Sequence, residues 1–135
     1  MNQNSNFQMG LLHLIHLIVN VDGHIDERER EAMTRIRAEE GIQDAVYQEF
    51  EKKIATSTED GIYQDGIAYL TKCSDEERLT VFVHLYKLSE ADANISTKEI
   101  RFLFYGLKET KLSFEDVVMS AGMSGGKFFT ESWSQ

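Results

Sequence analysis

Two short acidic segments contain the side chains best suited to binding a ligand. Their polar members are Asp22, Asp26 and Glu29 in the first segment, and Asp92, Asn94, Ser96 and Glu99 in the second. Carboxylate oxygens are preferred ligands of Ca²⁺ and Mg²⁺, and Ca²⁺ takes about six to eight oxygens. Neither segment offers enough ligands alone, so a cation site is expected only if the two pool them. The predicted metal ligands are Asp22, Asp26, Glu29, Asp92 and Glu99.

Helix capping is the structural alternative for these acids. Glu29 and Glu99 stand third in their expected helices, where a carboxylate completes a capping box and meets the positive end of the helix dipole. Asp22 and Asp92 stand at helix C-terminal ends, where a negative charge costs about 0.3 to 1 kcal/mol. A hydrogen bond within the turn offsets that cost by about 0.5 to 1.5 kcal/mol, so the sequence leaves both interpretations open.

Other reactive side chains form weaker patterns. His13 and His16 lie three residues apart and His24 follows, but a zinc site would need further ligands from elsewhere in the fold. Cys73 is the only cysteine and has no activating neighbours in sequence. Glu-x-x-His and His-Glu-x-x-His motifs are absent. The sequence therefore favours a binding protein over an enzyme.

Helices are expected on both sides of each acidic segment. In the first helix, apolar residues recur at helical spacing; these are Leu11, Leu14, Ile15, Ile18 and Val21. His13, His16 and Asn20 form the opposite stripe. Asp22-Gly23 is expected to end this helix. Asp26 with Glu29 then predicts the start of a second helix, which runs to about Gly41.

The remaining helices are predicted from capping residues and apolar periodicity. The third helix covers 44–55, and the seventh runs from Ser113 to about Gly122. The three helices between them are expected to begin at capping pairs, which are Ser57 (approximately) with Asp60, Ser74 with Glu77, and Ser96 with Glu99. No segment alternates apolar and polar residues between turn signals, so no strand is expected. The predicted fold is an all-α compact bundle of six or seven helices.

An internal repeat relates the two acidic segments. A shift of 70 residues aligns Asp22 with Asp92 and Glu29 with Glu99. The same shift pairs the apolar positions Leu11 with Val81, Ile15 with Leu85, Ile18 with Leu88, and Met33 with Leu103. We therefore expect an internal duplication of a helix-turn-helix unit.

The repeated turn, of the form Ala-Asp-Gly-x-Ile-x-x-x-Glu between two helices, resembles that of the TerB-like family associated with tellurite resistance. The resemblance covers about residues 8–122, and the copies depart from it at Val21 and Ala93. It implies a cytosolic bacterial helical domain whose acidic turns bind divalent cations in a stress response. A similar domain beside a J-domain in a membrane-anchored co-chaperone implies a protein-interaction role instead.

Charge and composition limit the partners. The net charge of −9 disfavours binding to nucleic acid or to an anionic membrane. The single cysteine excludes an intrachain disulfide, and MNQNSNFQMG lacks the features of a signal peptide, so a cytoplasmic location is expected. A protein partner or a homo-oligomer remains open.

Residues 1–123 are predicted to form one helical domain, followed by a glycine-hinged aromatic tail at 124–135. The tail carries Phe128, Phe129 and Trp133. Aromatic side chains contribute much apolar surface on burial. The tail is therefore expected either to dock on the domain's own surface or to bind a partner.

Overall fold

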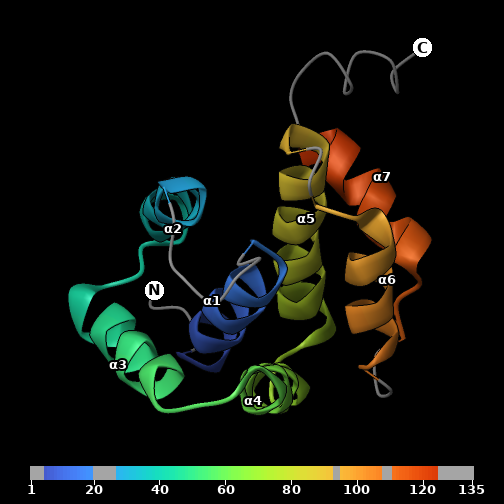
Figure 1. The fold of residues 1–135 in the computed structure, drawn as a ribbon. Coiled ribbons are helices and arrows are strands. Elements are labelled where there is room, and N and C mark those ends of the chain that lie inside the picture. The colour runs from blue at the N-terminus through green and yellow to red at the C-terminus, as the bar shows by residue number, and fades with distance from the viewer. Residues whose placement is uncertain (1–4, 20–26, 93–94, 108–110, 125–135) are drawn as a thin grey trace. The chain divides into compact units, whose positions relative to one another are not determined.

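The structure, a computed structural model, describes residues 5–19, 27–92, 95–107 and 111–124. Within these ranges the chain forms seven α-helices and no strand, which confirms the all-α prediction (Figure 1). The helices are α1 (Ser5–Val19), α2 (Glu27–Glu40), α3 (Asp44–Ala55), α4 (Glu59–Thr71), α5 (Asp75–Ala91), α6 (Thr97–Tyr105) and α7 (Phe114–Ser124). None of these described helices is both long and apolar enough to cross a membrane.

The chain divides into two compact units. Unit 1 spans Met1–Ser74 and contains α1 to α4, and unit 2 spans Asp75–Gln135 and contains α5 to α7. The boundary falls between Ser74 and the first residue of α5, so each unit holds one copy of the predicted repeat. The predicted border between helical domain and tail lies beside the end of α7 and stays a prediction.

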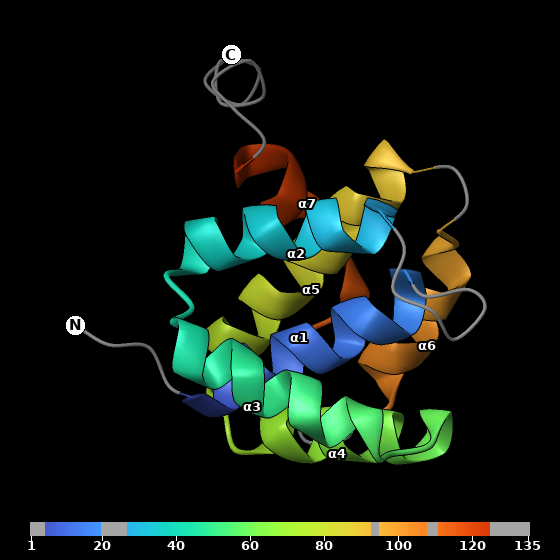
Figure 2. The same ribbon diagram turned by 60° about the vertical axis from the view of Figure 1, so that its left-hand side comes forward.

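In unit 1, α1 is the central helix and contacts α2, α3 and α4, most extensively α4 (Figure 2). Apolar side chains surround α1, and Leu11, Leu12, Leu14 and Ile15 are all fully buried. A helix that is apolar on every side is stable only where other segments enclose it. The prediction that His13 lies on an opposite, polar stripe is wrong, because this enclosure buries His13 as well.

Two glycines allow α1 and α4 to pack closely. A Cβ atom on Gly10 would lie 2.6 Å from Cδ2 of Leu70, and one on Gly66 would lie 3.0 Å from Cδ2 of Leu14. These separations are shorter than ordinary carbon–carbon contacts of about 3.5 to 4.0 Å. Gly66 weakens the helical propensity of α4 but permits the close approach.

In unit 2, α5 packs against both α6 and α7. Aromatic rings form much of this core. The rings of Phe82 and Phe104 meet edge to face, with centroids 5.2 Å apart, and Phe104 meets Phe114 in the same manner at 5.7 Å. This geometry is favoured by the ring quadrupoles, and it joins all three helices of the unit.

Capping residues set several helix starts. Ser96 is the N-cap of α6, as predicted, and its hydroxyl accepts a hydrogen bond from the backbone N–H of Lys98. For α4 the prediction near Ser57 is one residue early, because Thr58 is the N-cap and accepts from the backbone N–H of Gly61 at 3.0 Å. At the end of α2, Gly41 adopts a φ of 63°, the left-handed conformation expected there.

Helix positions in the two units agree with the 70-residue shift. Ser5 and Asp75 begin α1 and α5, and Glu27 and Thr97 begin α2 and α6. All four predicted pairs of apolar residues are buried in both copies. The duplication itself stays a prediction, and these matches support it.

Candidate functional site

The predicted cation ligands fall in both described and undescribed parts of the chain. Asp22 and Asp26 lie outside the described residues, whereas Glu29, Asp92 and Glu99 lie within them. Within the described ranges, no three His, Cys, Asp or Glu side chains are grouped so that they could hold a metal ion. Glu29 belongs to unit 1, whereas Asp92 and Glu99 belong to unit 2.

Glu29 lies in the first turn of α2, with only 1% of its surface exposed. One carboxylate oxygen, Oε2, lies 2.5 Å from Nδ1 of His16 on α1. A buried carboxylate is tolerated when a hydrogen-bonding partner replaces its lost hydration. Glu29 therefore ties α2 to α1 and is not presented to solvent as a ligand.

The second acidic segment has a different environment. Asp92 follows α5 and is half-buried; its backbone N–H donates to the carbonyl of Leu88, and its own carbonyl accepts from Ile95. Glu99 is exposed in the first turn of α6. A solvated carboxylate at this position interacts favourably with the helix dipole, which accounts for Glu99 without a ligand.

His13 is a buried polar residue in unit 1. Its Nδ1 donates a hydrogen bond of 2.7 Å to the carbonyl of Met9, and its Nε2 has no hydrogen-bond partner among the described residues. The rings of Phe50 and Tyr69 lie 5.3 Å from the imidazole, centroid to centroid. Burial lowers the pKa of His13, and the bond to Met9 opposes this only in part.

The two histidines of α1 do not form the zinc site considered from the sequence. Nδ1 of His16 is hydrogen-bonded to the carboxylate of Glu29, and Nδ1 of His13 is hydrogen-bonded to the carbonyl of Met9 in the same helix. His24 lies outside the described residues. Both imidazoles of α1 instead contact Phe50 of α3, and the centroids of the His16 and Phe50 rings are 6.1 Å apart. They act as parts of the interior that joins α1 to α2 and α3.

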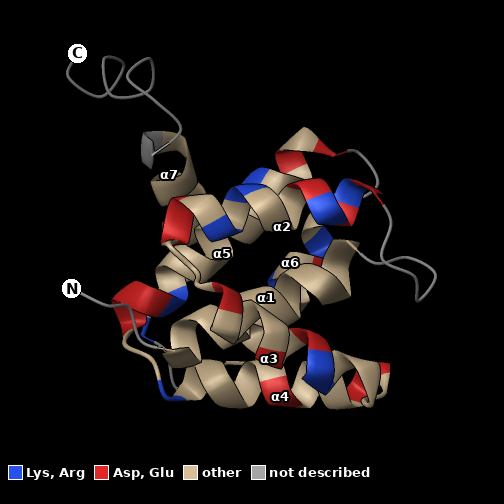
Figure 3. Cartoon of the chain, turned by 90° about the vertical axis from the view of Figure 1, so that its left-hand side faces the viewer, with Lys and Arg blue, Asp and Glu red and all other residues tan. Residues whose placement is uncertain are grey.

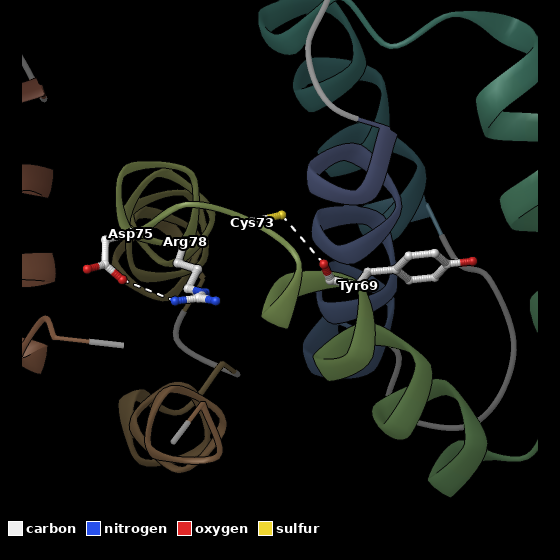
Figure 4. Close-up of polar contacts among 4 residues, drawn as sticks. All are labelled: Tyr69, Cys73, Asp75 and Arg78. Carbon is white, nitrogen blue, oxygen red and sulfur yellow. Dashed lines mark hydrogen bonds and ion pairs between the residues drawn. The ribbon is translucent and has the colours of Figure 1, made fainter. Parts of the chain in front are cut away.

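Cys73 is buried at the end of unit 1. Its thiol donates to the carbonyl of Tyr69 in α4 at 3.5 Å. In unit 2, the buried guanidinium of Arg78 donates to Asp75 at 3.1 Å; Figure 4 shows both contacts. Thiolate formation needs solvation or nearby positive charge, so the burial of Cys73 supports a structural role.

The outer side of α2 carries charges of both signs (Figure 3). A shallow, open depression of about 460 Å³ is lined there by Glu27, Arg30, Glu31, Thr34 and Arg35. All five belong to one helix, and their charges offset one another. The depression therefore has no feature that selects an anion, a cation or an apolar ligand.

Helix α6 presents a surface that the sequence reasoning missed. Phe102 and Tyr105 are 70% and 59% exposed, and the exposed side chains of Lys98 and Arg101 lie on the same side of the helix. We call these four residues the α6 face. Positions 98, 101, 102 and 105 follow the i, i+3, i+4, i+7 spacing of one helical side. That spacing, opposite the buried Ile100, Leu103 and Leu107, was the available signal.

The α6 face extends toward the start of α7. The guanidinium carbon of Arg101 lies 4.8 Å from the centre of the Phe114 ring, a cation–π contact that fixes the basic side chain. On α7, Val118 and Met119 are also exposed. All the large apolar side chains found exposed in the described ranges therefore belong to α6 and α7 of unit 2.

Comparison of the chain with protein-family models, with curated proteins and with solved structures finds no match in any of the three. The resemblance to the TerB-like family therefore rests on the repeated turn and its flanking helices alone.

Proposed function

We propose that this chain is a non-enzymatic, TerB-like helical domain that works by binding a protein partner through the α6 face. The observation that carries the proposal is the exposure of Phe102 and Tyr105 side by side on one helix. Aromatic residues and arginine are enriched at the centres of protein interfaces and contribute most of the binding energy there. A face with two aromatic rings and Arg101 has that composition.

The location of the reactive side chains supports a binding role over a catalytic one. His13, Glu29 and Cys73 have the chemistry for acid–base or nucleophilic catalysis, but all three are buried. Glu29 and Cys73 are engaged in the contacts with His16 and Tyr69 described above. A catalytic group must reach its substrate within hydrogen-bonding distance, which these positions do not favour.

Charge indicates the chemistry of the partner. The chain carries a net charge of −9, whereas the α6 face contains Lys98 and Arg101; the exposed Glu99 lies at the edge of this face, three residues before Phe102. Complementary charge selects partners and speeds association. The expected partner is a protein segment with apolar or aromatic side chains flanked by carboxylates.

Site-specific crosslinking tests this proposal. A photoreactive residue in place of Phe102 in the full-length chain should form an adduct with one protein, whereas the same residue in place of Thr34 on α2 should not. The identified protein is then purified and its affinity measured by calorimetry. Phe102→Ser with Tyr105→Ser should weaken binding by at least about 2 kcal/mol, roughly thirtyfold in Kd.

Two controls complete the experiment. Thr34→Ala with Arg35→Ala alters an exposed part of α2 and should leave the affinity unchanged. Far-ultraviolet circular dichroism verifies that the α6 variants keep their helices. A partner that binds the Phe102→Ser, Tyr105→Ser variant as tightly as the original chain contradicts the proposed face, as does the absence of any adduct specific to position 102.

Cation binding by the acidic turns is a separate prediction with less structural support. Glu29 would have to leave His16 before it could coordinate a metal, and Glu99 is accounted for at the start of α6. Asp22, Asp26 and Asp92 then remain as the main predicted ligands. The metal titration described in the Discussion tests them.

A further inference from the structure

The α6 face is an apolar and basic surface on one side of a short helix. Its aromatic residues, Phe102 and Tyr105, lie one turn apart, with Lys98 and Arg101 beside them. The opposite side of α6 is buried in unit 2 through Ile100, Leu103 and Phe104. The helix is thus anchored on one side, and its other side carries the exposed rings of Phe102 and Tyr105.

The last eleven residues of the chain have the composition that complements this face. They contain three aromatic side chains, Phe128, Phe129 and Trp133, together with one acidic residue, Glu131, and one basic residue, Lys127. They lie outside the described residues. Aromatic rings in this segment would match Phe102 and Tyr105, and Glu131, between the aromatic residues, would match the positive charges of the face, whereas Lys127 at the start of the segment would not.

The segment is also long enough to reach the face. It begins directly after α7, which ends at Ser124 and packs on the same α5 helix as α6. Phe114, the first residue of α7, contacts Arg101, and the eleven-residue α7 is about 16 Å long, whereas eleven extended residues span up to about 36 to 40 Å. In the sequence, Gly125 and Gly126 stand between the last residue of α7 and the aromatic residues of the segment. A short tether gives an effective concentration of about millimolar, so even weak contacts would be populated.

We propose that residues 127–135 dock on the α6 face of the same chain through Phe128, Phe129 and Trp133, and cover it until a protein partner displaces them. The displacement of the tail by a partner rests on the proposed function, because partner and tail would use the same face. The docking of the tail on the α6 face does not rest on it, because docking requires no partner. The tail is then an internal competitor that reduces the apparent affinity for weak partners.

Trp133 is the only tryptophan in the chain, so its fluorescence reports on the tail alone. In the full-length protein, its emission should be shifted to shorter wavelength relative to a synthetic peptide of residues 124–135. Quenching by acrylamide should be several-fold weaker than in the peptide. Emission and quenching equal to those of the free peptide would overturn the proposal.

Variants assign the docking face. Phe102→Ser with Tyr105→Ser should move emission and quenching most of the way to the peptide values. Met119→Ser replaces an exposed apolar residue of α7 and should change neither. A shift caused by Met119→Ser and not by the α6 variants would place the tail elsewhere and overturn the assignment.

A charge variant keeps the test valid if the double substitution unfolds α6. Lys98→Glu removes a basic side chain from the face at an exposed position in the first turn, where an acid favours the helix. It should increase quenching of Trp133 by a smaller factor, and more strongly at low salt. An unchanged value at low salt would contradict charge complementarity between tail and face.

Dilution separates docking within a chain from docking on a second copy. Fluorescence that is constant on dilution, with a monomeric mass by sedimentation, supports the proposal. Loss of the wavelength shift on dilution, together with a dimeric mass at high concentration, would overturn it. Failure of the partner experiment would leave these fluorescence results unchanged, so the two proposals can fail separately.

Discussion

The two helix pairs related by the 70-residue shift bury equivalent apolar residues but differ in their polar residues. Ile15 and Leu85 are equivalent and fully buried, whereas buried Glu29 in the first copy corresponds to exposed Glu99 in the second. His13 likewise corresponds to Val83. Apolar burial therefore suffices to specify the common helix pair. In unit 1, the buried polar residues make stability depend on hydrogen bonding and on pH, and unit 2 has no such buried residues at the equivalent positions.

Loss of a buried aliphatic side chain should affect both copies strongly. We expect Ile15→Ala and Leu85→Ala each to lower the free energy of unfolding by about 2 to 5 kcal/mol, because each leaves a cavity in a closed interior. The two effects are measured by unfolding in urea, with hydrogen exchange of backbone amides used to monitor each unit separately. A loss below about 1 kcal/mol at one position would show that the copies are not packed alike.

The paired glutamates should differ in their contribution to stability. Glu29→Gln weakens the buried contact with His16 and should lower the free energy of unfolding by about 1 to 3 kcal/mol. Glu99→Gln removes only an exposed charge near a helix N-terminus and should cost at most about 0.3 to 1 kcal/mol. Chemical denaturation of both variants, with His16→Phe as a partner control, checks the difference. Equal losses would contradict the distinction drawn from burial.

The pH dependence of stability should originate partly in His13. Its folded pKa is lowered by burial among side chains that include Tyr69, with Asp65, Lys53 and His16 as the nearest electrostatic influences. The unfolded state therefore binds a proton more readily, and stability rises with pH. Above the unfolded pKa of about 6.5, His13 is neutral in both states and the free energy of unfolding has its full value. As the pH falls below this pKa, the free energy of unfolding decreases by up to about 1.4 kcal/mol per pH unit.

Unfolding at pH 7.5 and pH 5.5 measures this slope. His13→Leu should reduce this slope by an amount that corresponds to at most one proton bound on unfolding, whatever the effect of the substitution on stability at neutral pH. His84→Leu in unit 2 is the matched control, because it replaces a half-buried histidine by the same residue. The same slope in His13→Leu and the original chain would show that His13 does not titrate differently in the folded state.

A divalent cation should produce the smallest effect. If the acidic turns bind Ca²⁺ or Mg²⁺, the metal raises Tm, and at a concentration equal to Kd it adds about 0.4 kcal/mol of stability. Asp22→Ala with Asp92→Ala should remove the increase, whereas Asp44→Ala on α3 should not. A flat thermal titration at millimolar metal would exclude the predicted site.

Much of the secondary structure could be predicted because its signals are local. The limits of α3 were predicted at 44–55, and Ser96 was identified before α6, since capping and periodicity depend on neighbouring residues. Ser57 and Thr58 show the limit of this reasoning. Both hydroxyls suit a helix start, and adjacent choices of this kind are not separated by local pattern.

The candidate sites were less predictable because they depend on contacts between distant residues. His16 and Glu29 are thirteen positions apart and meet only because α2 packs against α1. The acids of that turn suggested metal coordination, but the nearest partner of Glu29 is an imidazole. The exposed pair Phe102 and Tyr105 was overlooked, although both residues lie opposite Ile100, Leu103 and Leu107 in the spacing of the same helix.

The amino-acid sequence by itself determined an all-helical chain, most helix starts and the apolar positions shared by the two copies. Hydrogen bonding within a helix and the spacing of apolar side chains act over a few residues, so local sequence is enough. Only the tertiary structure decided that His13 and Glu29 are enclosed and how far the side chains of Phe102 and Tyr105 are exposed. Burial is a property of what packs against a side chain, and in this protein that is decided by other helices.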